Sequence, residues 1–210
     1  MKTLVIIDYG MSNLRSVSKA LEHVATREWR IEVTQQPDVI LRADKVVFPG
    51  QGAIGNCMTL LHDAHLFEVI QQCLTNKPFL GICLGLQTLL TRSEESGGTT
   101  GFNQIAGTVR HFTSRLPAAA PEHYKIPHMG WNQVQQQPHP LWQGIPDNSR
   151  FYFVHSYFVD PENTQLIAGK TDYGVCFASA LARENIFATQ FHPEKSQQMG
   201  LKLLHNFLNW

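Results

Sequence analysis

The stretch Lys77-Pro-Phe-Leu-Gly-Ile-Cys-Leu-Gly-Leu-Gln-Thr-Leu-Leu90 decides the fold. Its apolar pattern predicts a strand over 78–82, a sharp turn at Cys83 and then a helix that presents Leu86, Leu89 and Leu90 on one face. The glycines on both sides of Cys83 let neighbouring backbone approach the turn. Gly-x-Cys-x-Gly is the thiol counterpart of the strand–turn–helix motif that exposes a catalytic serine. We therefore expect Cys83 to be a nucleophile.

The alternative for Cys83 is a buried structural cysteine, because a lone cysteine is usually buried and inert. The two flanking glycines and the following helix favour the nucleophile, since a helix N-terminus stabilises a thiolate. Cys57, Cys73 and Cys176 form no Cys-x-x-Cys pair and lie in apolar or helical surroundings. We predict that these three are core residues and that all four stay reduced, as in a cytosol.

Length and composition exclude several classes of protein. The 210 residues, 43% of them hydrophobic, suffice to bury a substantial core. Seventeen basic and seventeen acidic residues cancel without a basic stripe, so nothing favours a nucleic acid or an anionic membrane as partner. Residues 1–8 predict a strand rather than a signal peptide, and no apolar run approaches the roughly 20 residues of a membrane-spanning helix. We expect a cytoplasmic protein with a small substrate or a protein partner.

The N-terminal half alternates between predicted strands and helices, which indicates an α/β fold with a central, mostly parallel sheet flanked by helices. Ligands of such sheets bind beyond the carboxyl ends of the strands. Three loops, at Asp8-Tyr-Gly10, Pro49-Gly-Gln-Gly52 and Cys83, fall at that edge. The predicted strands are 3–8, 31–34, 45–50 and 78–82, and the predicted helices are 12–24, 37–41 and 57–74.

The C-terminal half is rich in predicted strands and shows no second domain boundary, so we predict that residues 1–210 form a single domain. Residues 115–122 are predicted to form a surface loop, and a helix over 200–210 closes the fold. The predicted strands are 105–112, 129–134, 151–159, 166–170, 175–181 and 186–191.

His192 and Glu194 provide a candidate base and the carboxylate that orients it. Residues two apart in an extended segment project to the same face, so Glu194 can accept the Nδ1–H of His192. A thiol, an imidazole and a carboxylate are what acyl transfer through a thioester requires. The alternative for His192 is a surface or satisfied core histidine. An α/β-hydrolase fits poorly, because its acid precedes the histidine in sequence.

Metal and phosphate sites have little support in the sequence. No cluster of histidine and cysteine shows the spacing of metal ligands. The loop Gly50-Gln-Gly52 lacks the lysine and hydroxyl of a phosphate-binding P-loop. We therefore predict neither a metal nor a cofactor.

Three motifs together resemble the marks of the class I glutamine amidotransferases: Pro49-Gly-Gln-Gly52, Gly81-Ile-Cys-Leu-Gly-Leu-Gln87 and His192-Pro-Glu194. The resemblance covers residues 4 to 208 and implies a flavodoxin-like fold with added antiparallel strands. Within that family, further segments resemble the glutaminase subunits of imidazole glycerol phosphate synthases, from histidine biosynthesis. They are Asp8-Tyr-Gly10 with Asn13-Leu14, Pro127-His-Met-Gly-Trp-Asn132, Tyr152-Phe-Val-His-Ser-Tyr157 and His192-Pro-Glu-Lys-Ser196.

The resemblance implies that the protein hydrolyses glutamine to glutamate and ammonia. Cys83 would attack the side-chain amide, His192 would protonate the departing ammonia and activate water, and Glu194 would hold His192. The N–H of Leu84 and an N–H from Gln51 or Gly52 would form the oxyanion hole, each such donor commonly contributing ~3 kcal/mol. The residues that would hold glutamine are Gly50, Gly52, Gln87, His155, Ser156 and Tyr157.

Ammonia is useful only beside an acceptor enzyme, and the predicted elements leave no segment for an acceptor domain. The resemblance implies a heterodimer with a (β/α)8-barrel cyclase subunit. Asn13, Trp131 and Lys195 would lie at that interface, although Trp131 can equally be a core residue between Met129 and Val134.

Some positions depart from the family pattern. Gln51 stands where a small apolar residue is usual, Ser12 replaces a usual glycine, and the segment 113–124 is longer than expected. These departures leave open a paralogous subunit that supplies ammonia to another synthase, for example for sugar amination in surface polysaccharides. Two further alternatives are a cysteine hydrolase or peptidase and a catalytically silent regulatory subunit. The intact triad argues against the silent form.

Overall fold

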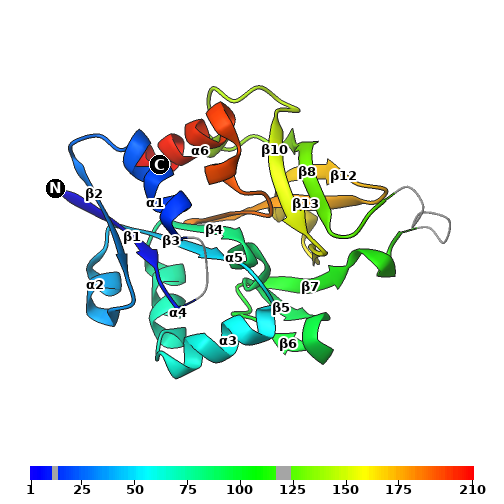
Figure 1. Ribbon diagram of the computed structural model, residues 1–210, viewed down its shortest axis with the longest axis horizontal. Coiled ribbons are helices and arrows are strands. Elements are labelled where there is room, and N and C mark those ends of the chain that lie inside the picture. The colour runs from blue at the N-terminus through cyan, green and yellow to red at the C-terminus, as the bar shows by residue number, and fades with distance from the viewer. Residues whose placement is uncertain (11–13, 117–123) are drawn as a thin grey trace.

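A parallel sheet forms the centre of the computed structural model, which describes residues 1–10, 14–116 and 124–210 (Figure 1). The strand order there is β2-β1-β3-β4-β14, and every neighbouring pair is parallel. This confirms the predicted α/β fold with a mostly parallel central sheet. The five strands are β1 (Lys2–Ile7), β2 (Trp29–Thr34), β3 (Lys45–Gly50), β4 (Phe79–Cys83) and β14 (Ile186–Thr189).

The sheet continues beyond β14 through added, largely antiparallel strands, in the order β13-β11-β7-β5-β6. Off this path, β12 pairs with β13, and β9 pairs with β12. Strands β8 and β10 form a separate antiparallel pair. The strands are β5 (Leu90–Ser93), β6 (Thr99–Thr100), β7 (Ile105–His111), β8 (His128–Gln133), β9 (Gln135–Gln136), β10 (Arg150–His155), β11 (Tyr157–Pro161), β12 (Ile167–Asp172) and β13 (Cys176–Arg183).

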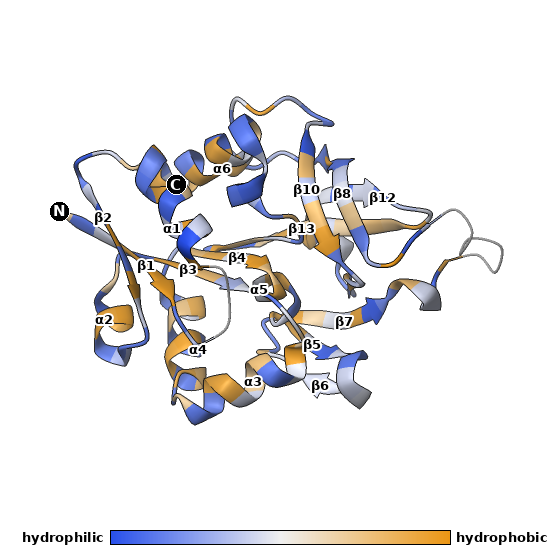
Figure 2. Cartoon of the chain, in the orientation of Figure 1, coloured by the Kyte–Doolittle hydropathy of each residue, from blue (hydrophilic) through white to orange (hydrophobic). Residues whose placement is uncertain are grey.

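Helices cover both faces of the parallel strands: α1 and α6 lie on one face, and α2, α3 and α4 lie on the other (Figure 1). Side chains alternate between the two cores with the period of two that a strand imposes. Leu4 and Ile6 pack with α1 and α6, whereas Val5 and Ile7 pack with α3 and α4. Figure 2 shows the apolar stretches of these helices and strands. The helices are α1 (Leu14–Val24), α2 (Pro37–Arg42), α3 (Ile54–Asp63), α4 (Phe67–Asn76) and α6 (Gln197–Asn209).

The helix after Cys83 is much shorter than predicted. It is α5 (Leu84–Gln87), and Leu90 begins β5, so the expectation that Leu89 and Leu90 extend one helix face is wrong. The leucines at 84, 86, 89 and 90 are all essentially buried, so their spacing reflects burial on every side rather than one helix face. The Thr88 carbonyl accepts from the Phe102 N–H instead of a helical donor.

The predicted strand over 151–159 is two strands. β10 ends at His155 and pairs with β8, and β11 begins at Tyr157 and pairs with β7 and β13. The apolar pattern of the sequence continues through the break at Ser156. Such a pattern reports burial and does not show that the two halves pair with different strands. The predicted helix over 57–74 is likewise divided, with His65 at φ +54° between α3 and α4.

The remaining short elements are single turns of 3-10 helix, and two of them carry residues of the site. They are η1 (Glu95–Gly97), η2 (Phe112–Ser114), η4 (Pro140–Trp142), η5 (Thr164–Leu166) and η6 (Pro193–Lys195). Among the helices that the structure describes, none has the length and apolar character needed to cross a bilayer.

All four cysteines are free. Cys57 and Cys73 are buried, as predicted, and burial raises the pKa of their thiols to about 12 and about 11. These thiols therefore stay protonated and inert at neutral pH. The prediction that Cys176 is a core residue is wrong: it is exposed at the start of β13, opposite Asp172 at the end of β12.

Candidate active site

Cys83 occupies a strained turn at the end of β4. Its φ of +55° and ψ of −103° lie outside the regions that residues with a side chain ordinarily adopt. Such a conformation costs on the order of 1–3 kcal/mol and persists only where its surroundings enforce it. Pairing of Cys83 with Gly50 of β3 provides one constraint. The turn aims the thiol at the carboxyl edge of the parallel strands, as predicted.

The two glycines around Cys83 allow α5 to pack directly on the strands. A Cβ on Gly81 would lie 2.7 Å from the Gly85 carbonyl oxygen. A Cβ on Gly85 would lie 2.0 Å from the carbonyl oxygen of Phe48 in β3. Neither position can hold a side chain unless the backbone moves. The Gly-x-Cys-x-Gly motif is therefore a packing requirement of this turn.

His192 and Glu194 form the predicted pair. Glu194 Oε1 accepts a hydrogen bond from His192 Nδ1 at 2.8 Å, and both side chains are only 3% exposed. The backbone conformation differs from the predicted one, because Glu194 lies in the 3-10 helix η6 rather than in an extended segment. Ser196 fastens the turn: its hydroxyl donates to the His192 carbonyl at 2.6 Å and accepts from the Tyr152 N–H.

The charges around His192 favour its protonated form. Burial alone would lower the pKa of the imidazole, but the neighbouring Cys83 sulfur and the Glu194 carboxylate outweigh burial and raise this pKa to about 10. His192 Nε2 is buried and has no hydrogen-bond partner among the described residues. This nitrogen is therefore free to exchange a proton with a reacting group.

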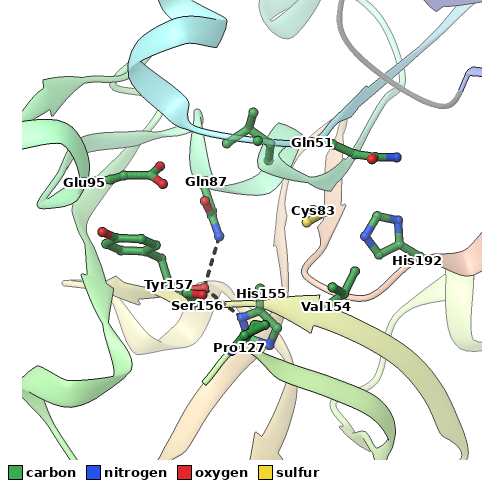
Figure 3. Close-up of a pocket in the computed structure, with 12 residues that line it drawn as sticks. Gln51, Cys83, Gln87, Glu95, Pro127, Val154, His155, Ser156, Tyr157 and His192 are labelled. Carbon is green, nitrogen blue, oxygen red and sulfur yellow. Dashed lines mark hydrogen bonds between the residues drawn. The ribbon is translucent and has the colours of Figure 1, made fainter. Parts of the chain in front are cut away.

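A cavity of about 310 Å³ opens over Cys83 (Figure 3). The predicted oxyanion-hole and glutamine-binding residues line it, with the exception of Gly50. Glu95 lies on one side of the cavity, and Cys83 and His192 lie on the other (Figure 3). The lining residues are Gln51, Gly52, Cys83, Leu84, Gln87, Glu95, Pro127, Val154, His155, Ser156, Tyr157 and His192.

Gly50 lies beneath the loop instead of facing the cavity. A Cβ there would lie 2.6 Å from the Tyr9 hydroxyl oxygen and 2.7 Å from the Leu84 Cβ. Gly50 thus lets the end of β3 approach the turn after Cys83. Gly52, with φ +83°, adopts the left-handed conformation that glycine favours and carries the loop along the cavity.

Gln87 is nearly buried in the wall of the cavity. Its Nε2 donates to the Tyr157 carbonyl at 3.1 Å and to Gln190 Oε1 at 3.2 Å. Because both amide hydrogens are used inside the protein, only the Oε1 acceptor of Gln87 remains for a ligand.

His155 supports the cavity as a neutral residue. Its Nδ1 donates to the Tyr157 carbonyl at 2.7 Å, and its Nε2 lies 2.9 Å from Nδ1 of His128. Burial lowers the pKa of His155 to about 3 and that of His128 to about 4. Since the Tyr157 carbonyl can only accept, His155 Nε2 must accept from His128. Both rings are therefore held in fixed tautomers.

The sequence analysis missed two polar residues of the site. Glu95 lines the cavity, and its Oε2 accepts from the Ile54 N–H at 2.8 Å. It lies in a polar, glycine-rich segment without any local sign of function. Gln190 is completely buried, and its Nε2 lies 3.7 Å from Cys83 Sγ. Its spacing of two from His192 is the signal that could have found it.

The predicted interface residues are placed in part. Trp131 is 42% exposed on β8, beside the 61% exposed Met129, so the structure does not support the core alternative for Trp131. Lys195 is partly exposed. Asn13 and Ser12 lie outside the described residues, as do residues 117–122 of the predicted loop over 115–122. In the described part of the sequence, no three residues are grouped as metal ligands.

Comparisons with known proteins give one family. The family model described as glutamine amidotransferase class-I matches residues 5–210. The chain is 55% identical to the imidazole glycerol phosphate synthase subunit HisH of Aromatoleum aromaticum, covering 100% of this chain and 99% of that protein. It is 56% identical to the protein of the same description from Nitrosococcus oceani, with coverages of 100% and 98%.

Solved structures agree in fold at low sequence identity. One neighbour, described as a glutamine amidotransferase, has a TM-score of 0.72 and 11% identity, covering 98% of this chain and 97% of that one. Another is a glutamine amidotransferase from Thermotoga maritima, with a TM-score of 0.65 and 16% identity, and with coverages of 94% and 78%.

Proposed function

The chain belongs to the class I glutamine amidotransferase family, and from this premise we propose that it is the glutaminase subunit of an imidazole glycerol phosphate synthase. Relatives of that description are 50–56% identical over nearly their whole length, which favours histidine biosynthesis over a paralogous synthase. The observation that carries the proposed chemistry is the strained Cys83 in one cavity with His192, which is hydrogen-bonded to Glu194 behind it. Residues 1–210 would form one glutaminase domain, which the family match over 5–210 supports.

The cavity gives glutamine a direction. The Glu95 carboxylate lies across the cavity from Cys83 (Figure 3), where it would bind the α-ammonium group of the amino acid. The free Oε1 of Gln87 would accept an N–H of the ligand between these two ends. The backbone of His155, Ser156 and Tyr157 forms the facing wall. The side-chain amide of glutamine then lies against Cys83.

The reaction would begin from a thiolate and an imidazolium. The Cys83 thiolate attacks the side-chain carbonyl carbon, and the C=O electron pair moves to the oxygen as the tetrahedral intermediate forms. The N–H of Leu84 and an N–H of Gln51 or Gly52 would stabilise that oxyanion, at ~3 kcal/mol for each donor. His192 donates its proton to the departing nitrogen, so ammonia leaves and a thioester remains.

His192 would then act as the base. Neutral after the first step, it takes a proton from water as the water oxygen attacks the thioester carbon. The second oxyanion uses the same backbone donors, and its collapse releases glutamate and restores the Cys83 thiolate. Glu194 keeps Nδ1 protonated throughout, so Nε2 always faces the reacting groups.

A partner subunit would receive the ammonia, since ammonia released into water is mostly protonated and lost. The relatives are described as subunits, and the proposed partner is a (β/α)8-barrel cyclase that forms a heterodimer with this protein in the cytoplasm. The exposed Met129 and Trp131 on β8 support docking there, because aromatic residues often anchor interfaces. Lys195 and Asn13 would complete this interface.

The test is glutamate release from glutamine by the purified protein, alone and with the cyclase and its nucleotide ligand. Cys83→Ala serves as the blank, and Cys73→Ala, another buried cysteine, is the matched control. We expect hydrolysis that requires Cys83 and that the cyclase stimulates. If the cyclase does not change the rate of glutamate release, the ammonia is supplied to a different synthase. No hydrolysis in either condition would refute the glutaminase, and substantial turnover by Cys83→Ala would refute the thioester mechanism.

A further inference from the structure

A side chain outside the triad contacts the nucleophile. Gln190 follows β14 directly, is completely buried, and places Nε2 at 3.7 Å from Cys83 Sγ. Its backbone is fixed, because the Gln190 N–H donates to the Ser179 carbonyl of β13 at 2.9 Å. A buried amide is retained in a protein core only where its hydrogen bonds are satisfied. One of the partners of this amide is the reacting sulfur.

The orientation of the Gln190 amide follows from its neighbours. The Tyr157 carbonyl can only accept, so the atom of Gln87 that lies 3.1 Å from it must be the donor Nε2. That same nitrogen lies 3.2 Å from Gln190, which must therefore present its oxygen to Gln87. The amide nitrogen of Gln190 is left facing Cys83. A reversed amide would place two donors, or two acceptors, against each other.

The Tyr157 carbonyl is itself held in place. It also accepts from Nδ1 of His155 at 2.7 Å, and His155 accepts from His128. The far end is Asn132, whose Nδ2 lies 3.3 Å from Nε2 of His128 and donates to the Asp172 carbonyl at 2.8 Å. A hydrogen-bond network thus runs from the partly exposed Asn132 of β8, through the buried His128 and His155, to the nucleophile, and Gln190 is its last member.

We propose that Gln190 is a positioning residue that holds Cys83 Sγ through an N–H···S hydrogen bond and stabilises its thiolate. Hydrogen bonds strengthen when the acceptor is charged, so this contact favours the thiolate over the thiol. The amide of Gln190 never titrates, so it can stabilise the sulfur as the resting thiolate and again when the thiolate leaves the second tetrahedral intermediate. In that second step it acts together with His192, which is then protonated. The statement about the second step rests on the proposed function.

The test measures the thiol without using glutamine. Alkylation of Cys83 by iodoacetamide is followed from pH 5 to 10 by the mass of its peptide, which separates Cys83 from the other cysteines. His192 and Tyr9 are two titratable groups among the described residues that interact with Cys83, and both are unchanged in the variants. In Gln190→Met we expect the apparent pKa of Cys83 to rise by about one unit, equivalent to about 1.4 kcal/mol. The kcat for glutamine should fall about tenfold with KM within about twofold, by the same conversion.

Thr189→Val is the matched control, because Thr189 is also buried at the end of β14 and its hydroxyl donates to the Phe191 carbonyl rather than to Cys83. Its Cys83 pKa should equal that of the unaltered protein. An unchanged pKa in folded Gln190→Met would overturn the proposal. If Gln190→Met does not fold, Gln87→Met provides the test. This substitution removes the hydrogen bond that orients the Gln190 amide, so the pKa of Cys83 should rise, but by less than one unit. An unchanged pKa of Cys83 in folded Gln87→Met would overturn the proposal.

The two proposals can fail separately in these measurements. A raised pKa in Gln190→Met, in a protein that does not hydrolyse glutamine, would leave the positioning role intact and refute the proposed function. Hydrolysis of glutamine by the unaltered protein, together with an unchanged Cys83 pKa in Gln190→Met, would support the proposed function and refute the positioning role of Gln190.

Discussion

Substitution of Gly85 should disable the site without touching any reacting group. The Cβ of Gly85→Ala would lie 2.0 Å from the Phe48 carbonyl oxygen, whereas real Cβ atoms essentially never approach another atom closer than 3.0 Å. The turn after Cys83 must therefore move by about 1 Å away from β3. A misplacement of about 1 Å at a catalytic group can cost about 100-fold in rate. Overpacking of this kind also costs about 1–3 kcal/mol of stability.

The assay is kcat for glutamate release, measured beside the free energy of unfolding in urea. Gly55→Ala is the matched control, because its Cβ would meet nothing closer than 3.4 Å in α3. An alanine there should keep full activity and stabilise the helix by several tenths of a kcal/mol. We expect Gly85→Ala to lose about 100-fold in kcat while remaining folded. Activity within about twofold of the unaltered protein would refute the argument that close packing on β3 positions Cys83.

Three further predictions concern Glu194, His192 and Trp131. Glu194→Gln should lower kcat by at least about 100-fold, towards the ~10⁴ of other triads, because a neutral partner holds the imidazolium less well; kcat within tenfold would contradict this. The pKa of His192 is about 6.5 in the unfolded chain and about 10 in the folded protein, so its stabilisation is complete below about pH 6.5 and lost as the pH rises to about 10. Cys83→Ala removes one group that raises the pKa of His192. In this variant, urea unfolding between pH 6 and 10 should therefore show the free energy of unfolding falling at a lower pH than in the unaltered protein. Identical pH dependences of the two proteins would argue against an interaction between Cys83 and His192. Trp131→Ala should weaken binding of the cyclase by about 30-fold, as for an interface anchor of about 2 kcal/mol, with basal glutamine hydrolysis unchanged; unchanged binding in a titration would place the interface elsewhere.

The grouping of Cys83, His192 and Glu194 was predictable because each of these residues carries a local signal. The glycines around Cys83 are required by atoms within a few residues or in the adjacent strand, so the motif reports the turn. His192 and Glu194 are two residues apart, and their contact forms even though η6 replaces the expected extended backbone. Short-range geometry of this kind survives an error in the assigned secondary structure.

The sequence was less informative wherever pairing between distant strands decides the outcome. The apolar run through 151–159 looks continuous, yet β10 and β11 separate at Ser156 because they pair with different strands. The same break brings the Tyr157 carbonyl to Gln87, 70 residues away in sequence. Glu95 reaches the cavity from η1 in a similar way. The periodicity of apolar residues in the sequence gives no information about contacts between residues so far apart.

The departure at position 51 does not weaken the proposed oxyanion hole. The Gln51 side chain is exposed where the loop leaves β3, so a larger residue displaces nothing in the core. The proposed donor is a backbone N–H, which glutamine provides as well as a small apolar residue does. What the loop does require is a close approach to the nucleophile, and Gly50 permits it, because a Cβ there would meet both Tyr9 and Leu84. The constraint on this loop is therefore carried by the residue before position 51, and that residue matches the family pattern.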